Sequence, residues 1–392
     1  MPEPSVYLDH AATTPVRPEV LEAMLPYLGG DRFGNPSSAH RPGRAAHAGL
    51  EQARREIAEA VGTEPSSVVF TSGGTEADNL AILGSAFAAR SAGRRMLAAV
   101  AATEHKAVLA AAHAVVHHGG EERILPVDGQ GRLDLGALDQ VLVEHPALVS
   151  VMWANNETGV LQPVPDIAQR CEERGTLFHT DLVQAVGRVP VSLRGAPIAL
   201  ATLSGHKLGA PKGIGALIVR KGTPLEPMLH GGSQQGALRP GTENVAGAVA
   251  LGRAAQLAAQ ERAAEAPRLA ALRDDLAKAL RDVVPDLVIP GESAPRVPHI
   301  LNLLVPGVDS GALLMHLDLA GISASGGSAC QTGAPDPSHV LLAMGFPRDL
   351  AASAVRFSLG RLTRAEDIAR VAELWSFLVA RVRQVGEAFG RV

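Results

Sequence analysis

Short runs of consecutive apolar residues alternate, along the first part of the chain, with stretches in which apolar residues recur at helical spacing. Unbroken apolar runs are typical of strands buried on both faces, and recurrence every three to four residues is typical of helices packed on a sheet. The predicted strands are Ser67–Phe70, Leu97–Ala101, Leu148–Trp153, Thr176–His179, Leu200–Leu203 and Ala216–Val219. Predicted helices include Thr75–Arg90 and Pro165–Arg174, the latter ended by Gly175. This alternation predicts an α/β fold with a mostly parallel sheet.

The pattern changes after Asn244. A stretch rich in Ala, Leu, Arg and Glu continues to about Val284 and predicts one or two long helices. Apolar runs follow, with helices between them and at the C-terminus: Ile300–Val305, Leu319–Ser323 and Val355–Leu359. We therefore expect a large domain over residues 18–255 and a smaller α+β domain made of residues 1–17 and 256–392.

Composition and charge exclude several classes of function. The 392 residues are 46% hydrophobic and 19% charged, which is typical of a globular protein. The 36 basic and 40 acidic residues provide no excess of positive charge for nucleic acid or an anionic membrane. We expect neither a secretory signal nor a membrane span, because no suitable apolar run occurs. The two cysteines, Cys171 and Cys330, exclude a disulfide scaffold and favour a cytoplasmic setting.

Small residues join the first predicted strand to the helix after it. Residues 71–76 read Thr-Ser-Gly-Gly-Thr-Glu. Glycine lets the backbone approach an anion, and the free N–H groups at a helix N-terminus favour phosphate. The same residues would also form an ordinary N-cap without a ligand, so this segment alone leaves both interpretations open. Neither a complete GxGxxG nor a GxxxxGK motif occurs, which excludes the common nucleotide-binding loops.

Asp181 and Lys207 each follow a predicted buried strand. A carboxylate there lies where open α/β sheets bind ligands, and beside a pyridine nitrogen it would keep that nitrogen protonated, although it would also suit a helix N-cap. A desolvated lysine has a lowered pKa and is nucleophilic. The rival lysines, Lys106 and Lys212, are expected to face solvent. The order of loop, Asp and Lys predicts pyridoxal phosphate bound covalently through Lys207.

Further motifs follow one another along nearly the whole chain. They are Tyr7–Pro15, Phe33–Ser37, Thr71–Asn79, Thr103–Lys106, Asn155–Gly159, Asp181 with Gln184, Ser204–Lys207, Arg239–Thr242, Gly327–Cys330 and Arg356–Arg361. In this order they resemble the motifs of the cysteine desulfurases, a family of the class V aminotransferase group. The resemblance implies a fold-type I pyridoxal-phosphate-dependent transferase that acts on L-cysteine as a homodimer.

The resemblance also implies a role for each motif residue. Lys207 would hold the cofactor and shuttle the Cα proton, His105 would stack on the cofactor ring and assist proton transfer, and Asp181 would pair with the ring nitrogen. Further cofactor contacts would come from Gly74, Thr75, Asn156, Gln184, Ser204 and His206, joined by Thr242 of the partner subunit. Substrate would be bound by Asn35, Asn156 and Arg356, with the Arg356 guanidinium on the substrate carboxylate.

Cys330 would be the nucleophile by the same resemblance. Residues 325–337 are mostly small or turn-forming, which predicts a mobile loop that would let one thiol reach both substrate and acceptor. Attack on the substrate sulfur would leave alanine and a persulfide for an acceptor protein in iron–sulfur cluster assembly or tRNA thiolation. The spacing from Cys330 to Ser338 resembles that of the long-loop desulfurases. Cys171 lies in a predicted helix and is expected to be a small buried apolar residue.

Two other functions remain open. A sibling enzyme of the same fold would be a selenocysteine lyase, a cysteate-type lyase or an aminotransferase, and an aminotransferase has no use for a mobile cysteine. A catalytically silent assembly partner is the third possibility. The presence of Lys207, Asp181, His105 and Cys330 together disfavours it, because an inactive relative would be free to lose any of them.

A metal site is the remaining alternative. His113 and His117 are four residues apart, with His118 adjacent, so a helix would present two imidazoles on one face. No glutamate is placed as in an HExxH motif. We therefore expect histidines that face solvent and no metal.

Overall fold

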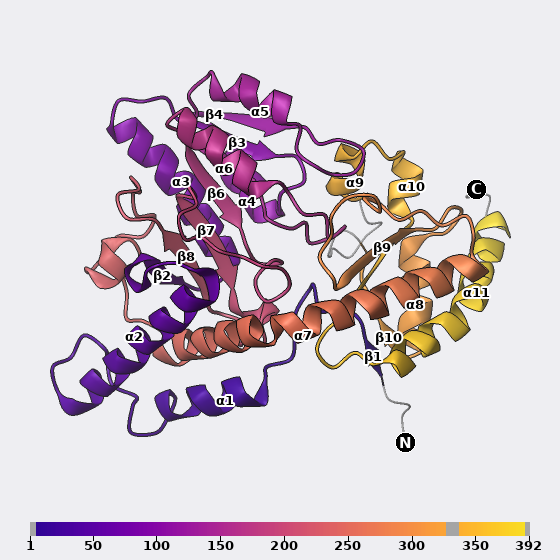
Figure 1. Cartoon of the computed structure of the whole chain (residues 1–392), viewed down its shortest axis with the longest axis horizontal. Helices are drawn as coiled ribbons and strands as arrows, with labels where there is room; N and C mark the ends of the chain where they lie inside the picture. The colour runs from indigo at the N-terminus through magenta and orange to yellow at the C-terminus, as the bar shows by residue number, and fades with distance from the viewer. Residues whose placement is uncertain (1–4, 327–336, 389–392) are drawn as a thin grey trace.

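The computed structural model describes residues 5–326 and 337–388, so Cys330 lies outside the described residues. Figure 1 shows a large domain and a small domain joined by the long helix α7, Val245–Val283. The large domain is built on a seven-stranded sheet, and the small domain contains two two-stranded sheets. No helix within the described ranges is long and apolar enough to cross a membrane.

The strands of the large sheet lie in the order β2-β8-β7-β6-β5-β3-β4. In chain order they are β2 Val68–Thr71, β3 Leu97–Ala101, β4 Glu121–Leu125, β5 Leu148–Ser150, β6 Leu177–Asp181, β7 Leu200–Ser204 and β8 Gly215–Val219. Strand β8 is antiparallel to both of its neighbours, whereas β7, β6, β5, β3 and β4 pair in parallel. The prediction of a mostly parallel sheet is therefore confirmed.

Two predictions about the strands of the large sheet need correction. Strand β4 was missed, because Glu121, Glu122 and Arg123 interrupt its apolar pattern. It is an edge strand, where charged residues reach solvent and discourage pairing with other chains. The strand predicted over Leu148–Trp153 ends at Ser150. Beyond it, the Met152 N–H donates to the carboxyl group of Glu104 instead of to a neighbouring strand.

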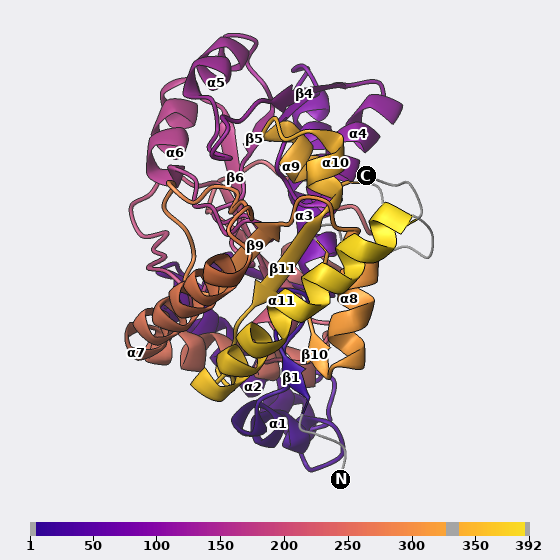
Figure 2. The same ribbon diagram turned by 90° about the vertical axis from the view of Figure 1, so that its right-hand side faces the viewer.

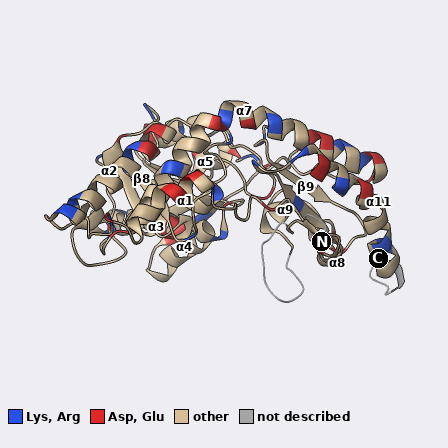
Figure 3. Cartoon of the chain, turned by 90° about the horizontal axis from the view of Figure 1, so that it is seen from below, with Lys and Arg blue, Asp and Glu red and all other residues tan. Residues whose placement is uncertain are grey.

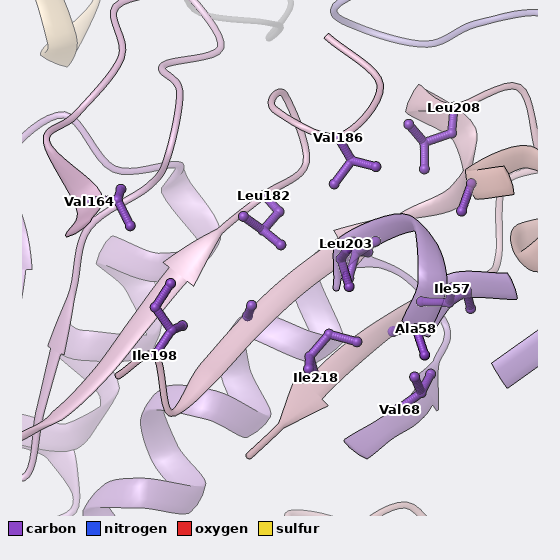
Figure 4. Packing of buried hydrophobic residues seen from close by; sticks show 14 of the residues in the cluster. Ile57, Ala58, Val68, Val164, Leu182, Val186, Ile198, Leu203, Leu208 and Ile218 are labelled. Carbon is purple, nitrogen blue, oxygen red and sulfur yellow. The ribbon is translucent and has the colours of Figure 1, made fainter. Parts of the chain in front are cut away.

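Helices cover both faces of the large sheet. On one face α3 and α4 enclose an apolar core with the sheet, and on the other α2, α6 and the first half of α7 do so. Figure 4 shows this second core, where Ile57 and Ala58 of α2 meet Val68 and Ile218 of the sheet. The helices of this domain are α1 Pro18–Met24, α2 Arg41–Val61, α3 Gly74–Ser91, α4 Lys106–His117, α5 Leu135–Leu142 and α6 Val164–Glu173, with 3-10 helices at Leu25–Tyr27, Pro65–Ser67, Gly205–Lys207 and Gln234–Ala237.

Helix α7 is one continuous helix of 39 residues with Pro267 inside it. Its first half contributes Leu251 to the core beneath the large sheet, and its second half contributes Leu276 to the core of the small domain. The predicted boundary between residues 255 and 256 falls inside this helix. Figure 3 shows basic and acidic residues interspersed along α7, so this outer surface carries no field of one sign.

The small domain combines segments from both ends of the chain. Strand β1 pairs in parallel with β10, and β11 pairs antiparallel with β9. Figure 2 shows α11 lying across this end of the molecule, beside α8 and over β11. The elements are β1 Val6–Tyr7, β9 Ile300–Leu304, α8 Ser310–Leu319, β10 Ile322–Ser323, α9 His339–Ala343, α10 Arg348–Ala352, β11 Ala354–Ser358 and α11 Ala365–Ala388. Leu319, predicted to begin a strand, instead ends α8.

Candidate active site

A cavity of about 530 Å³ lies at the carboxyl ends of β5, β6 and β7. This is the edge at which open α/β sheets bind ligands. The predicted site residues that line it are Gly74, Thr75, His105, Asn156, Asp181, Gln184, Ser204, His206, Lys207 and Arg356. Asn35 and Thr242 are exposed and lie outside this lining, and Cys330 is not among the described residues. The cavity therefore unites side chains from both domains.

One wall of the cavity is suited to a phosphate group. Helix α3 begins at Gly74, and no side chain caps its N-terminus, so its first N–H groups point out unsatisfied. Ser204 lies opposite, because a Cβ added at Gly74 would be 3.5 Å from the Ser204 Cβ. His206 is held nearby by a 3.1 Å contact between its Nδ1 and the Thr13 hydroxyl. Burial, followed by Lys207 and Lys212, lowers the pKa of His206 to about 4, so its ring is a neutral hydrogen-bonding group.

The amine of Lys207 is held by backbone carbonyls of the N-terminal segment that also lines the cavity. It follows β7 in the 3-10 helix Gly205–Lys207, and its Nζ donates to the carbonyl oxygens of Ala11 and Ala12 at 2.5 and 2.6 Å. Burial and the positive charge of Arg356 lower the pKa of Lys207 to about 8. A much larger fraction of this amine is therefore neutral and nucleophilic near neutral pH than for a lysine in water.

Asp181 is the last residue of β6 and is buried. Its Oδ1 accepts a hydrogen bond from the Val183 N–H at 2.7 Å. Burial raises the pKa of Asp181 to about 6, while this hydrogen bond and the charge of Lys207 act in the opposite direction. A carboxylate held in this way is a strong partner for a protonated ring nitrogen.

His105 and Gln184 have fixed orientations. His105 is the N-cap of α4, and its Nδ1 accepts from the Ala107 N–H at 3.1 Å, so the proton of the neutral ring is on Nε2. Desolvation, followed by the charges of Lys207 and Lys106, lowers the pKa of His105 and keeps that ring neutral. Gln184 donates from Nε2 to the Ala11 carbonyl at 3.0 Å, which ties it to the same backbone segment as Lys207.

Arg356 of β11 brings the small domain to the cavity. Its guanidinium donates to the Asn156 carbonyl at 2.8 Å, to Asp9 Oδ1 at 2.9 Å and to the Ser325 hydroxyl at 3.2 Å. Its Nε is buried without a partner. A buried guanidinium with N–H groups left unpaired, Nε among them, is suited to bind a carboxylate. Sequence reasoning predicted Arg356 but neither Asp9 nor Ser325, which orient it.

These residues fit pyridoxal phosphate. The open N-terminus of α3 with Thr75, Ser204 and His206 matches the phosphate group, Asp181 matches the ring nitrogen, and Lys207 matches the aldehyde. The fit rests on chemistry that is unusual without a ligand: a half-buried amine and a buried carboxylate, with uncapped helix N–H groups in the same cavity.

Residues 6–371 match the family model described as Aminotransferase class-V. The chain belongs to this family. Within it, the sequence is 46% identical to the cysteine desulfurase of Cereibacter sphaeroides over 96% of each chain. It is 41% identical to the cysteine desulfurase IscS of Dictyoglomus turgidum, over 97% of this chain and 96% of that protein. A solved structure named NifS-like protein superposes with a TM-score of 0.87 at 33% identity, covering 98% of this chain and 99% of the other. This class V member is therefore a cysteine desulfurase by family.

The remaining predictions concern the other cysteine, the histidine pair and Lys212. Cys171 is fully buried in the large-domain core, and burial raises the pKa of its thiol to about 12. His113 and His117 face solvent, as predicted, and His113 Nδ1 lies 3.0 Å from Glu122. In the described part of the chain, no group of three or more His, Cys, Asp or Glu residues is placed to hold a metal ion. Lys212 is exposed, yet it also lines the cavity.

The sequence analysis assigned no role to three buried polar residues at or near the cavity, Asp78, Glu104 and His179. Asp78 and Glu104 belong to the motifs Thr71–Asn79 and Thr103–Lys106, but only the structure shows that both are buried, with Asp78 lining the cavity. His179 lies within the predicted strand Thr176–His179 and looked like an ordinary strand residue. The available signal was the presence of ionisable residues within apolar segments, since such residues are rarely buried without a partner.

Proposed function

We propose that this chain removes sulfur from L-cysteine, with pyridoxal phosphate bound at Lys207, to give L-alanine and a persulfide on Cys330. The observation that carries the proposal is the convergence of Lys207, Asp181 and Arg356 on one cavity. A nucleophilic amine, a carboxylate for a ring nitrogen and a guanidinium for a substrate carboxylate are the groups that cofactor-dependent chemistry on an amino acid requires.

Four residues that line the cavity would each have a task in this reaction. Arg356 would bind the cysteine carboxylate and so fix the orientation of Cα. Lys207 would remove the Cα proton and return it later, as a neutral amine can. Bound pyridoxal phosphate supplies an electron sink for the charge that develops at Cα. Asp181 would hold the ring nitrogen protonated, and the Nε2 proton of His105 would face the cavity as a hydrogen-bond donor.

Cys330 would complete the reaction as a thiolate. Its sulfur would attack the substrate sulfur, forming an S–S bond while the Cβ–S bond breaks, and the substrate fragment would take up a proton to become alanine. A thiol acceptor would then accept the outer sulfur atom by exchange at the persulfide. Of the described residues before and after Cys330 in the chain, Ser325 is hydrogen-bonded to Arg356 and Ser338 to Glu157.

We also propose a homodimer, in which Thr242 of the partner subunit completes the phosphate site. The exposed position of Thr242 supports this, because it lies outside the cavity of its own chain. The acceptor would be a scaffold or sulfur-carrier protein that presents a thiolate. Such chemistry needs reduced thiols, which favours the cytoplasm.

The experiment that tests the proposal measures alanine and sulfide after the purified protein is incubated with cysteine and a thiol reductant. We expect both products from the wild type and from Cys171→Ser, and almost none from Cys330→Ser, because a hydroxyl is a poor nucleophile toward sulfur. Without the reductant, peptide mapping should find one extra sulfur on the Cys330 peptide. Wild-type turnover by Cys330→Ser would overturn the proposed mechanism.

A further inference from the structure

Three carboxyl groups are buried at the part of the cavity assigned to the cofactor ring: Asp181 and Asp78 are among its lining residues, and Glu104, next to His105 in the chain, lies outside that lining. Asp181 ends β6, Asp78 lies on α3, and Glu104 lies between β3 and α4. Their exposed fractions are 7%, 1% and 0%. Carboxyl groups are almost never buried to this extent unless they are paired or protonated, so the charge state of each needs a physical account.

A chain of polar side chains links two of these carboxyls across the sheet. His179 of β6 contacts the Ser150 hydroxyl of β5 through Nδ1 at 2.8 Å and the Thr202 hydroxyl of β7 through Nε2 at 3.0 Å. The Ser150 hydroxyl also interacts with Glu104, and the Thr202 hydroxyl with Asp78. The chain therefore runs Glu104, Ser150, His179, Thr202, Asp78, and every member is at most 1% exposed.

Of the three carboxyl groups, only Asp181 is stabilised in its ionised form by a nearby positive charge in the described part of the chain. Lys207 acts on Asp181, whereas no cation in the described part of the chain lowers the pKa of Asp78 or Glu104. Burial lowers the pKa of His179 to about 3, so this imidazole is neutral and offers no charge. Burial, together with the negative charge of Asp181, raises the pKa of Asp78 and of Glu104 well above the ordinary range.

The hydrogen bonding of Asp78 and Glu104 also favours the uncharged form of both carboxyl groups. Glu104 Oε2 and Asp78 Oδ1 have no hydrogen-bond partner, and Asp78 Oδ1 lies 3.7 Å from His179 Nε2. An ionised carboxylate with a bare oxygen and no cation would carry a large desolvation cost. A protonated carboxyl in the same place loses only ordinary hydrogen bonding, which is a far smaller cost.

We propose that Asp78 and Glu104 are held as neutral, protonated carboxyls, so that Asp181 is the only one of the three that presents a negative charge to the cofactor ring. They are positioning residues: the hydroxyl–imidazole chain across β5, β6 and β7 ends at Glu104 on one side and at Asp78 on the other. A second buried negative charge would raise the pKa of Lys207 and keep that amine protonated. The inference rests on the proposed function in one respect, the pairing of Asp181 with the ring nitrogen.

Infrared difference spectroscopy of the holoenzyme in H₂O and D₂O tests the charge states directly. At about pH 8, Asp181 and Glu157, with pKa values of about 6 and about 7, are mostly ionised. The wild type should still show protonated carboxyl C=O stretches that shift in D₂O. Asp78→Asn and Glu104→Gln should each remove one of them, and Asp181→Asn, the matched control, should remove none. Absence of these bands in the wild type would overturn the proposal even if a variant failed to fold.

The pH titration of the cofactor absorbance gives a second readout that a purely structural role would not change. An amide replaces a neutral carboxyl without a change of charge, so the midpoint of Asp78→Asn or Glu104→Gln should stay within about 0.3 pH unit of the wild type. Loss of a buried negative charge would instead move it by about one unit or more, and that result would refute the proposal. Asp78→Ala should weaken cofactor retention, which Asp78→Asn restores. Desulfurase activity is assayed separately, so its failure leaves the infrared result intact.

Discussion

The lowered pKa of Lys207 predicts how fast the protein attaches its cofactor as pH changes. A fall from 10.5 to about 8 raises the neutral fraction of the amine at pH 7.5 from about 0.1% to about a quarter, a gain of roughly 250-fold. The attachment rate to cofactor-free protein should therefore rise with pH and level off above about pH 8, because only the neutral amine attacks an aldehyde.

Two substitutions should move this midpoint in opposite directions. The charge of Arg356 lowers the pKa of Lys207, and the charge of Asp9 raises it. The Arg356 guanidinium donates to Asp9 Oδ1 at 2.9 Å. Arg356→Leu should raise the midpoint, and Asp9→Asn should lower it, each by roughly half a unit to one unit. The charge of Lys212 is retained in Lys212→Arg, so this variant should titrate like the wild type.

Rapid-mixing absorbance of cofactor-free protein with pyridoxal phosphate measures the rate, and borohydride reduction followed by peptide mapping identifies the modified lysine. The label should be on Lys207. A midpoint near 10.5, or shifts of the same sign in Arg356→Leu and Asp9→Asn, would refute the electrostatic reasoning. Label on Lys106 or Lys212 would refute the assignment of the lysine.

Three further predictions concern other parts of the molecule. Asp181→Asn should retain the cofactor but slow exchange of the cysteine Cα proton with solvent by about 100-fold or more, and a wild-type exchange rate would contradict the role of its charge. Arg356→Lys should raise KM for cysteine at least about 10-fold, because a lysine cannot form the paired hydrogen bonds of a guanidinium with a carboxylate. An unchanged KM in steady-state kinetics would show that another residue binds the substrate carboxylate. Trp375→Ala should lower the free energy of unfolding by about 3–5 kcal/mol, since this side chain is fully buried against Phe357 in the small-domain core; a loss below about 1 kcal/mol in urea denaturation would contradict that packing.

The amino-acid sequence by itself determined the elements and the chemistry of single residues. Predicted strands ended at or near Asp181 and before Lys207, and the observed β6 and β7 end at Asp181 and Ser204. Such predictions succeed because burial on both faces demands a continuous apolar run, a signal contained within a few neighbouring residues. The edge strand β4 was not predicted, because a half-exposed strand lacks a continuous apolar run.

Only the tertiary structure decided which distant residues meet. The carbonyls of Ala11 and Ala12 hold Lys207, and Asp9 orients Arg356, across nearly 200 and nearly 350 residues of chain. His179 is an unremarkable strand residue until parallel pairing places Ser150 and Thr202 on either side of it. Backbone carbonyls and hydroxyl groups occur in almost every segment, so their types carry no signal. Their roles arise from strand register and domain packing, which depend on the whole chain.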